Sequence, residues 1–246
     1  SLWPGMASAA AANVARQQDR VRIFEASKSF HGKLGNHTEV VRIAGLITGP
    51  VVPEQWDSSG RNADFFDIKS DVEALLLLAA EKDELKFVPI SHVALQPGQA
   101  AEIRRDGESI GVLGKLHPQL AKRYDLKRPV YVFELDAHKT LASKAPAASA
   151  ISRFPAIRRD IAVIVDDSIS ADDLVTAVAS CDPALIRDVR IFDIYRGGGI
   201  EAGRKSVAIG LILQETSRTL TDEDADVVMT ATISQLKDKF AAELRD

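Results

Sequence analysis

The stretch LIRDVRIFDIYRGGGIEAGRKSVAIGLIL, residues Leu185–Leu213, decides the fold of the second half of the chain. Its outer segments, Leu185–Tyr195 and Lys205–Leu213, are rich in β-branched and aromatic residues, which is typical of strands. The glycine-rich segment between them supplies the positive φ angles that a tight connection needs. We therefore predict two antiparallel strands joined by a turn.

The segments on either side of this hairpin complete a regular order of elements. The run RRDIAVIV, Arg158–Val165, has the composition of a strand. Ser170 opens an S-x-x-D capping pattern, which indicates a helix to about Ser180. Thr221 opens a similar pattern before a second helix, and a short strand, AAELR, follows. The order βαββαβ predicts a ferredoxin-like domain, with both helices on one face of the sheet and the other face left open.

The first half of the chain shows a mixed pattern in which antiparallel strands dominate. The strand candidates are RVRIFEASKSF, VVRIAGLITGP, LKFVPI, AAEIRRDGESIGVLGKL and VYVFELD. In the fourth of these, Asp106-Gly107 supplies a hairpin turn. The stretch DIKSDVEALLLLAA, from Asp67, carries apolar residues at helical spacing, and LHPQLAKRYDL indicates a short helix. The predicted fold class is α+β.

The clearest boundary in the chain is LASKAPAASA, Leu141–Ala150, which is small, contains proline and has no periodicity. We therefore expect a first domain over residues 1–143, a linker over residues 144–151 and a second domain over residues 152–246.

The composition is ordinary for a globular protein, with 246 residues, 46% hydrophobic and 27% charged, and a formal net charge of −4. From residue 151 onward, 12 Lys and Arg face 17 Asp and Glu, so overall charge does not indicate a nucleic-acid binder. The longest strongly apolar run, Ala74–Ala80, is too short to cross a bilayer. The opening SLWPGMASAAAA lacks the basic segment of a signal peptide, and the absence of Met at position 1 suggests a piece of a longer chain. A single cysteine, Cys181, fits the reducing cytoplasm.

The glycine triplet Gly197–Gly199 is not a phosphate-binding loop. Arg204 stands where G-x-x-x-x-G-K-[ST] requires lysine, and a strand follows instead of a helix. We therefore interpret the triplet as a hairpin connection only.

The strand before this turn carries Asp193 and Tyr195 two residues apart, so both side chains fall on one face. Strict alternation places Val189 and Ile191 on that face too, and Phe192 and Ile194 on the face that packs under the helices. A tyrosine on an open sheet face can stack on a base, and a carboxylate can accept hydrogen bonds from a guanine edge. The alternative is a solvated strand end, which the pattern alone favours.

Other chemistry has little support in the sequence. The cations at strand ends and in loops form either a phosphate-facing surface or ordinary solvation; they are Arg158, Arg159, Arg196, Arg204, Lys205 and Arg218. The five histidines have no ligand-like spacing, and Cys181 has no neighbouring base. The residues by themselves indicate no active site.

Taken together, these motifs resemble one family. SRFPAIRRDIAVIV, FDIYRGGGIEAGRKSVAIGLIL, QETSRTLTDEDADVV and the final ELRD resemble the C-terminal anticodon-binding domain of the bacterial phenylalanyl-tRNA synthetase β subunit. RQQDRVRIFE, IAGLITG, DFFDIKSDVEALL, LQPGQAAEI, IGVLGKLHPQL and VFELD resemble the last part of its catalytic-like module, in the same order. The resemblance covers essentially the whole chain.

The resemblance implies a cytoplasmic α2β2 enzyme that charges tRNA-Phe with phenylalanine, using ATP and Mg²⁺ at a site in the α subunit. The β module resembles a class II synthetase core without its signature motifs and serves assembly. This implies that the present chain holds no cofactor, metal or catalytic residue of its own. Its implied partners are tRNA-Phe and the α subunit, and no membrane.

The resemblance also implies roles for individual residues. The family's tyrosine that stacks on the first anticodon base, a guanine, corresponds to Tyr195, and the pocket around that base corresponds to Asp193, Ser206 and Ala162. The resemblance therefore favours base reading over a solvated strand end. Candidate contacts to the RNA backbone are Arg158, Arg196, Lys205 and Arg218.

Two alternatives stay open from the sequence. One is a ferredoxin-like regulatory domain that binds a small ligand. The other is a general single-strand RNA binder, although the sheet lacks the aromatic-rich K/R-G-F/Y-G/A-F-V-x-F/Y signature of such domains.

Overall fold

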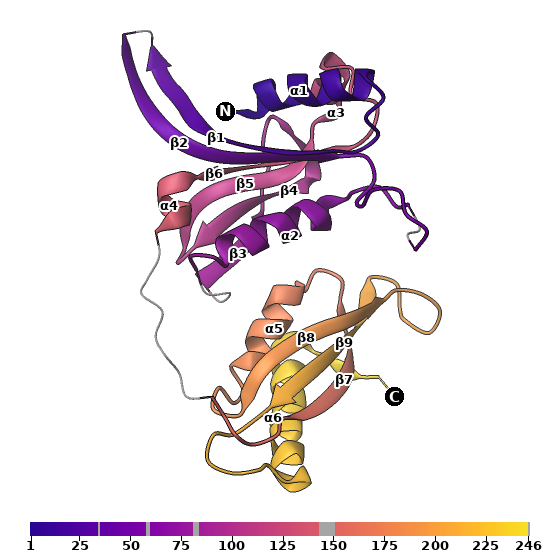
Figure 1. The fold of residues 1–246 in the computed structure, drawn as a ribbon. Coiled ribbons are helices and arrows are strands. Elements are labelled where there is room, and N and C mark those ends of the chain that lie inside the picture. The colour runs from indigo at the N-terminus through magenta and orange to yellow at the C-terminus, as the bar shows by residue number, and fades with distance from the viewer. Residues whose placement is uncertain (34, 58–59, 81–83, 143–150, 246) are drawn as a thin grey trace. The chain divides into compact units, whose positions relative to one another are not determined.

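The computed structural model describes residues 1–33, 35–57, 60–80, 84–142 and 151–245 (Figure 1). The chain divides into two compact units, Ser1–Pro146 and Ala147–Asp246. The predicted linker lies outside the described residues, apart from Ile151. No helix in the described ranges is both long enough and apolar enough to cross a bilayer.

The first unit is built on a six-stranded antiparallel sheet in the described part of the chain, with the order β1-β2-β6-β5-β4-β3. The strands are β1 (Val21–Lys33), β2 (Asn36–Thr48), β3 (Leu85–Pro89), β4 (Leu95–Arg105), β5 (Glu108–Leu116) and β6 (Val130–Asp136). The helices are α1 (Trp3–Ala15), α2 (Phe65–Leu76), α3 (Pro118–Arg123) and α4 (Ala137–Leu141). Helices α1 and α3 lie over one face of the sheet and α2 over the other, each with its own apolar cluster (Figure 1).

Local signals explain most of this unit. Asp106 and Gly107 join β4 to β5 with φ angles of 49° and 82°, as a two-residue hairpin turn requires. Helix α2 begins at Phe65, two residues before its predicted start, because the Asp64 side chain accepts hydrogen bonds from the N–H groups of the first turn. Helix α1 has no counterpart among the predicted elements.

The second unit confirms the predicted βαββαβ order. Its elements are β7 (Ile157–Asp166), α5 (Ala171–Ala179), β8 (Ile186–Tyr195), β9 (Arg204–Leu213), α6 (Asp222–Phe240) and β10 (Glu243–Leu244). The described strands form an antiparallel sheet in the order β10-β7-β9-β8. Both helices cover one face of this sheet and share a core with it (Figure 1). The α+β class with antiparallel sheets is thus confirmed, and the helices leave the second face of this sheet free.

Candidate nucleic-acid interface

The free face of the second sheet is defined by the alternation of β7 and β9. Ile161 and Val163 of β7, and Val207 and Ile209 of β9, are buried in the core with the helices. Side chains of neighbouring residues point to opposite faces of a strand. Ala162 and Ser206, one residue away from these core positions, therefore lie on the face that the helices do not cover.

Strand β8 reaches this face through a bulge. Ile191 pairs with Ile209 on the core side, whereas Asp193 pairs with Ala208 on the free side, so the register shifts between them. Phe192 is the extra residue of this bulge. It shifts by one residue the alternation of side chains between the two faces of the sheet. Its side chain is 54% exposed, and the Arg158 guanidinium carbon lies 5.3 Å from the centre of its ring.

The bulge corrects part of the strand prediction. Strict alternation predicted that Phe192 packs under the helices. This prediction was wrong, because Phe192 is the extra residue of the bulge and its side chain is exposed. Val189 and Ile191 were expected beside Asp193, but both pack against the core. Ile194 does pair on the helix side, with Val207.

The strand register brings Ala162, Asp193, Tyr195 and Ser206 together on the free face. Ala162 and Asp193 pair with Ala208 from its two sides, and Tyr195 pairs with Ser206. Directly paired residues have Cβ atoms about 5 Å apart. These four side chains, which the family resemblance implies to be one site, therefore form one compact group across β7, β9 and β8.

Within this group the polar atoms differ in what they already bind. The exposed Asp193 carboxylate makes no hydrogen bond or ion pair with any other described residue, so it is a free acceptor. The Tyr195 hydroxyl donates to the carbonyl oxygen of Gly198 at 3.3 Å, and the residue is 38% exposed. Ser206 is 3% exposed although it faces away from the helices, which shows that side chains cover it on the free face.

The four predicted backbone contacts have unequal positions. Arg158 lies on the free face, where its Nε donates to Asp160 at 2.8 Å. Arg196 donates to Asp167 at 2.9 Å, and Arg218 pairs with Asp224. All three ion pairs lie at the surface.

Lys205 points the other way. It pairs with Val165 on the helix side and is 7% exposed. Its Nζ donates to the carbonyl oxygens of Asp167 at 2.9 Å and Ile169 at 2.6 Å. Burial lowers the pKa of its ammonium group, and the neighbouring Arg196 charge lowers it further. The side chain is thus occupied in holding the loop before α5.

Arg245 belongs to the free face and was missed in the sequence. Its backbone N–H donates to the carbonyl oxygen of Ala162 at 2.9 Å. Its guanidinium carbon lies 4.9 Å from the centre of the Tyr195 ring. Nothing in local spacing indicates this contact, because it depends on the pairing of β10 with β7.

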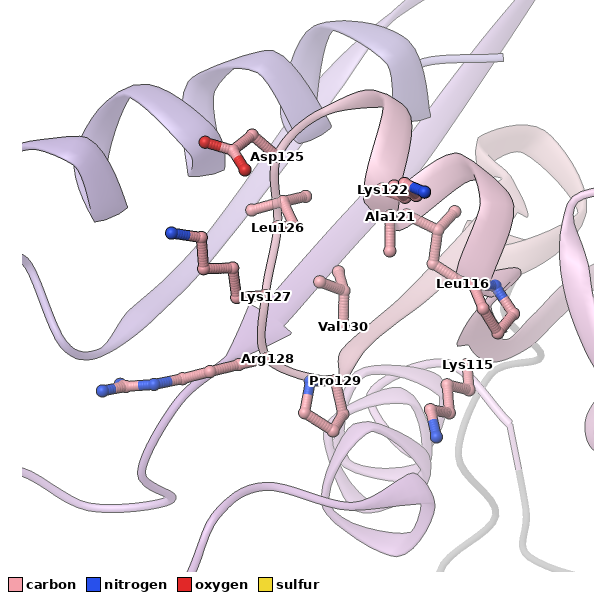
Figure 2. A pocket seen from close by; sticks show the side chains of 11 residues that line it. Lys115, Leu116, Ala121, Lys122, Asp125, Leu126, Lys127, Arg128, Pro129 and Val130 are labelled. Carbon is pink, nitrogen blue, oxygen red and sulfur yellow. The ribbon is translucent and has the colours of Figure 1, made fainter.

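The first unit offers a cavity of about 480 Å³ beside α3, shown in Figure 2. Leu116, Leu126 and Val130 give it an apolar lining, and Lys115 and Lys127 stand among its lining residues. Asp125 is its single acid, and no histidine, cysteine or serine lines it. Across the described residues no group of three or more His, Cys, Asp or Glu side chains is placed to hold a metal ion.

Two family models match the chain, one to each unit. The model described as "Phenylalanyl tRNA synthetase beta chain CLM domain" matches residues 1–137. The model described as "Ferredoxin-fold anticodon binding domain" matches residues 152–245, which include the whole free face described above.

Curated relatives match over the full length of the chain. A protein of Methylococcus capsulatus is 45% identical over 246 residues, one of Pseudomonas fluorescens 42% over 245, and one of Nitrosococcus oceani 40% over 247. Each carries the name phenylalanine–tRNA ligase beta subunit, and in each case the match covers 100% of this chain and 31% of the relative. The chain thus spans about a third of the length of these relatives.

Among solved structures, a pyrrolysyl-tRNA synthetase of Desulfitobacterium hafniense matches with a TM-score of 0.41 and 14% identity. That match covers 57% of this chain and 48% of the other.

Proposed function

The chain belongs to the phenylalanyl-tRNA synthetase β-chain family, and on that premise we propose that it is the C-terminal region of a phenylalanine–tRNA ligase β subunit. In this proposal the second unit binds the anticodon of tRNA-Phe. The first unit is non-catalytic and supports an α2β2 assembly with the α subunit. The domain division at 1–143, 144–151 and 152–246 is part of the proposal.

The observation that carries the anticodon role is the group of four side chains on the free face. Tyr195, Asp193, Ser206 and Ala162 come from three strands and meet in one place through their register. An aromatic ring and a carboxylate without a partner, side by side on an uncovered sheet face, are suited to hold a base and read its edge.

In this proposal each of the four residues contributes differently to the recognition of guanine. The Tyr195 ring offers a stacking surface, and one stacked base is worth about 1–3 kcal/mol. The Asp193 carboxylate accepts hydrogen bonds from N1–H and the 2-amino group of guanine. Adenine would place its N1 lone pair against the same carboxylate, and an unpaired polar group in such a site is costly. The side chains of Ser206 and Ala162 are small, so they leave space for the base above the sheet.

The basic residues serve this proposal to different degrees. Arg158 is best placed, because it lies on the free face beside Phe192. Arg196 can exchange an exposed carboxylate for a phosphate at little cost, whereas Arg218 would have to leave Asp224 at the start of α6. Lys205 would first have to break two hydrogen bonds to backbone carbonyls, so we assign it the weakest role of the four.

The chemistry of charging belongs, in this proposal, to the α subunit. ATP and Mg²⁺ supply activation of phenylalanine there, and no step of it uses a residue of the present chain. The free face contributes binding energy and selects the tRNA. The cytoplasm remains the predicted compartment.

The test is aminoacylation by the complete enzyme carrying Tyr195→Ala. With normal tRNA-Phe we expect kcat/KM to fall roughly 5- to 150-fold, as loss of one base stack implies. Discrimination against a tRNA with another first anticodon base should largely disappear. Tyr195→Phe keeps the ring and should retain most of the activity.

Val227→Ala is the matched control, because this exposed side chain lies on α6. It should leave both charging rates unchanged. Equal charging of the two tRNAs by the wild-type and Tyr195→Ala enzymes alike would overturn the anticodon role.

A further inference from the structure

Arg245 covers the part of Tyr195 that a base would need. The sheet order β10-β7-β9-β8 puts Arg245 and Tyr195 on opposite sides of β7 and β9. Because its backbone is bonded to Ala162 and its guanidinium lies over the Tyr195 ring, the two side chains meet above the strands between them. Ser206, which pairs with Tyr195, is buried on the free face.

Tyr195 is 38% exposed beside the Arg245 guanidinium. The backbone of Gly197 lies against its phenol end, where a methyl group on Gly197 would come within 2.7 Å of the hydroxyl oxygen and 2.9 Å of Cζ. A base that stacks on the ring face over which the Arg245 guanidinium lies must occupy the space that the guanidinium now fills. The guanidinium and the base cannot be there together.

The charge of Arg245 indicates where it goes when it is displaced. Arg158, Arg196 and Arg218 each pair with a carboxylate, whereas no acid among the described residues pairs with Arg245. Its backbone stays tied to Ala162, so the guanidinium remains within one side-chain length of the site. A phosphate of the incoming RNA is the partner that suits a planar, permanently charged group.

We propose that Arg245 is an exchangeable cap on the base-reading site: it covers Tyr195 in the absence of RNA and moves to an RNA phosphate when a base stacks on Tyr195. This inference rests on the proposed anticodon role. It adds a residue that the predicted site lacks, and it couples recognition of a base to an electrostatic contact.

The test measures binding of a 17-nucleotide anticodon stem-loop RNA to the full 246-residue chain over a range of salt concentrations. Each phosphate contact on single-stranded RNA contributes about −0.7 to the slope of log K against log salt. We expect Arg245→Ala to weaken binding roughly tenfold at low salt and to make the slope shallower by about 0.7. Arg245→Lys should keep the slope. Arg187→Ala, which removes an arginine at the far end of β8, should change neither.

Nuclear magnetic resonance gives a direct second measurement. Side-chain protons of Arg245 should show a ring-current shift, identified by its loss in Arg245→Lys, and RNA should abolish it. If Arg245→Ala binds the RNA more tightly than the wild type, or if its slope of log K against log salt is unchanged, the proposal that Arg245 moves from Tyr195 to an RNA phosphate is overturned. If wild-type protein shows no preference for guanine, the proposed function itself fails; a retained preference with an unchanged slope rejects the role of Arg245 alone.

Discussion

At the scale of single residues, Tyr195 depends on the neighbours that leave it room. Its ring lies beside Gly197, its hydroxyl donates to Gly198, and the Arg245 guanidinium rests on it. The glycine triplet was predicted to serve the turn only. In the structure Gly197 also has a packing role, because any side chain there would displace the aromatic ring.

Gly197→Ala tests this role against a neighbour in the same turn. The new methyl group would meet Tyr195, whereas a methyl group on Gly198 would meet nothing within 4 Å. We expect Gly197→Ala to weaken stem-loop binding by about 1 kcal/mol or more, because the stacking ring is pushed aside. Gly198→Ala should bind as the wild type does. Titration of both variants with the same RNA gives the answer, and equal affinities would contradict the packing role.

The alternation in the sequence correctly predicted that Asp193 and Tyr195 lie on the same face, but it did not include the bulge at Phe192. Strict alternation predicted the same face for Val189 and Ile191, which are in the core. The bulge at Phe192 shifts the face between Ile191 and Asp193. A one-residue bulge depends on pairing with β9, so composition along β8 alone does not reveal it.

At the scale of elements, the helix starts of the second unit follow the sequence closely. Ser170 with Asp173, and Thr221 with Asp224, form reciprocal capping boxes at α5 and α6. The Arg218 guanidinium and the backbone N–H of Thr221 hold the pKa of Asp224 well below its usual range. The ionised carboxylate of Asp224 thus stabilises the start of α6.

This carboxylate predicts a dependence of stability on pH. Because the pKa of Asp224 is lower in the folded than in the unfolded chain, its contribution is present above about pH 4 and is lost as the pH falls further. Asp224→Asn should therefore lower the free energy of unfolding at pH 7, and the difference from wild type should narrow below pH 4. Glu223→Gln, in the same turn without these hydrogen bonds, is the control for urea denaturation at both pH values. A constant difference across the range would refute the assignment.

Helix α1 was not predicted, because its segment carries few of the local signals that indicate a helix. Helix α1 is alanine-rich, and its segment lacked a clear amphipathic pattern, although Pro4 in the first turn is a usable start signal. The short closing strand predicted in AAELR, by contrast, is confirmed as β10, which pairs with β7. The hairpins and capped helices were predictable because the residues that specify them are adjacent in sequence.

At the scale of the whole molecule, each unit has its own core and its own family match. The free face of the second unit was predicted from the order of elements and from the family resemblance together. Arg245 was not, because its contact with Tyr195 joins residues that only the folded sheet brings together. In the proposed function, this free face reads one base.

Binding of four anticodon stem-loop RNAs, which differ only in the first anticodon base, to the full chain tests that claim most directly. We predict that the guanine RNA binds tightest, by roughly tenfold or more over the other three, since no other base offers the Asp193 carboxylate two adjacent N–H donors. Asp193→Asn should narrow the gap between guanine and adenine, while Asp188→Asn, a carboxylate on the same strand that pairs with Arg190, should preserve it. The same dissociation constant for all four RNAs would contradict the account.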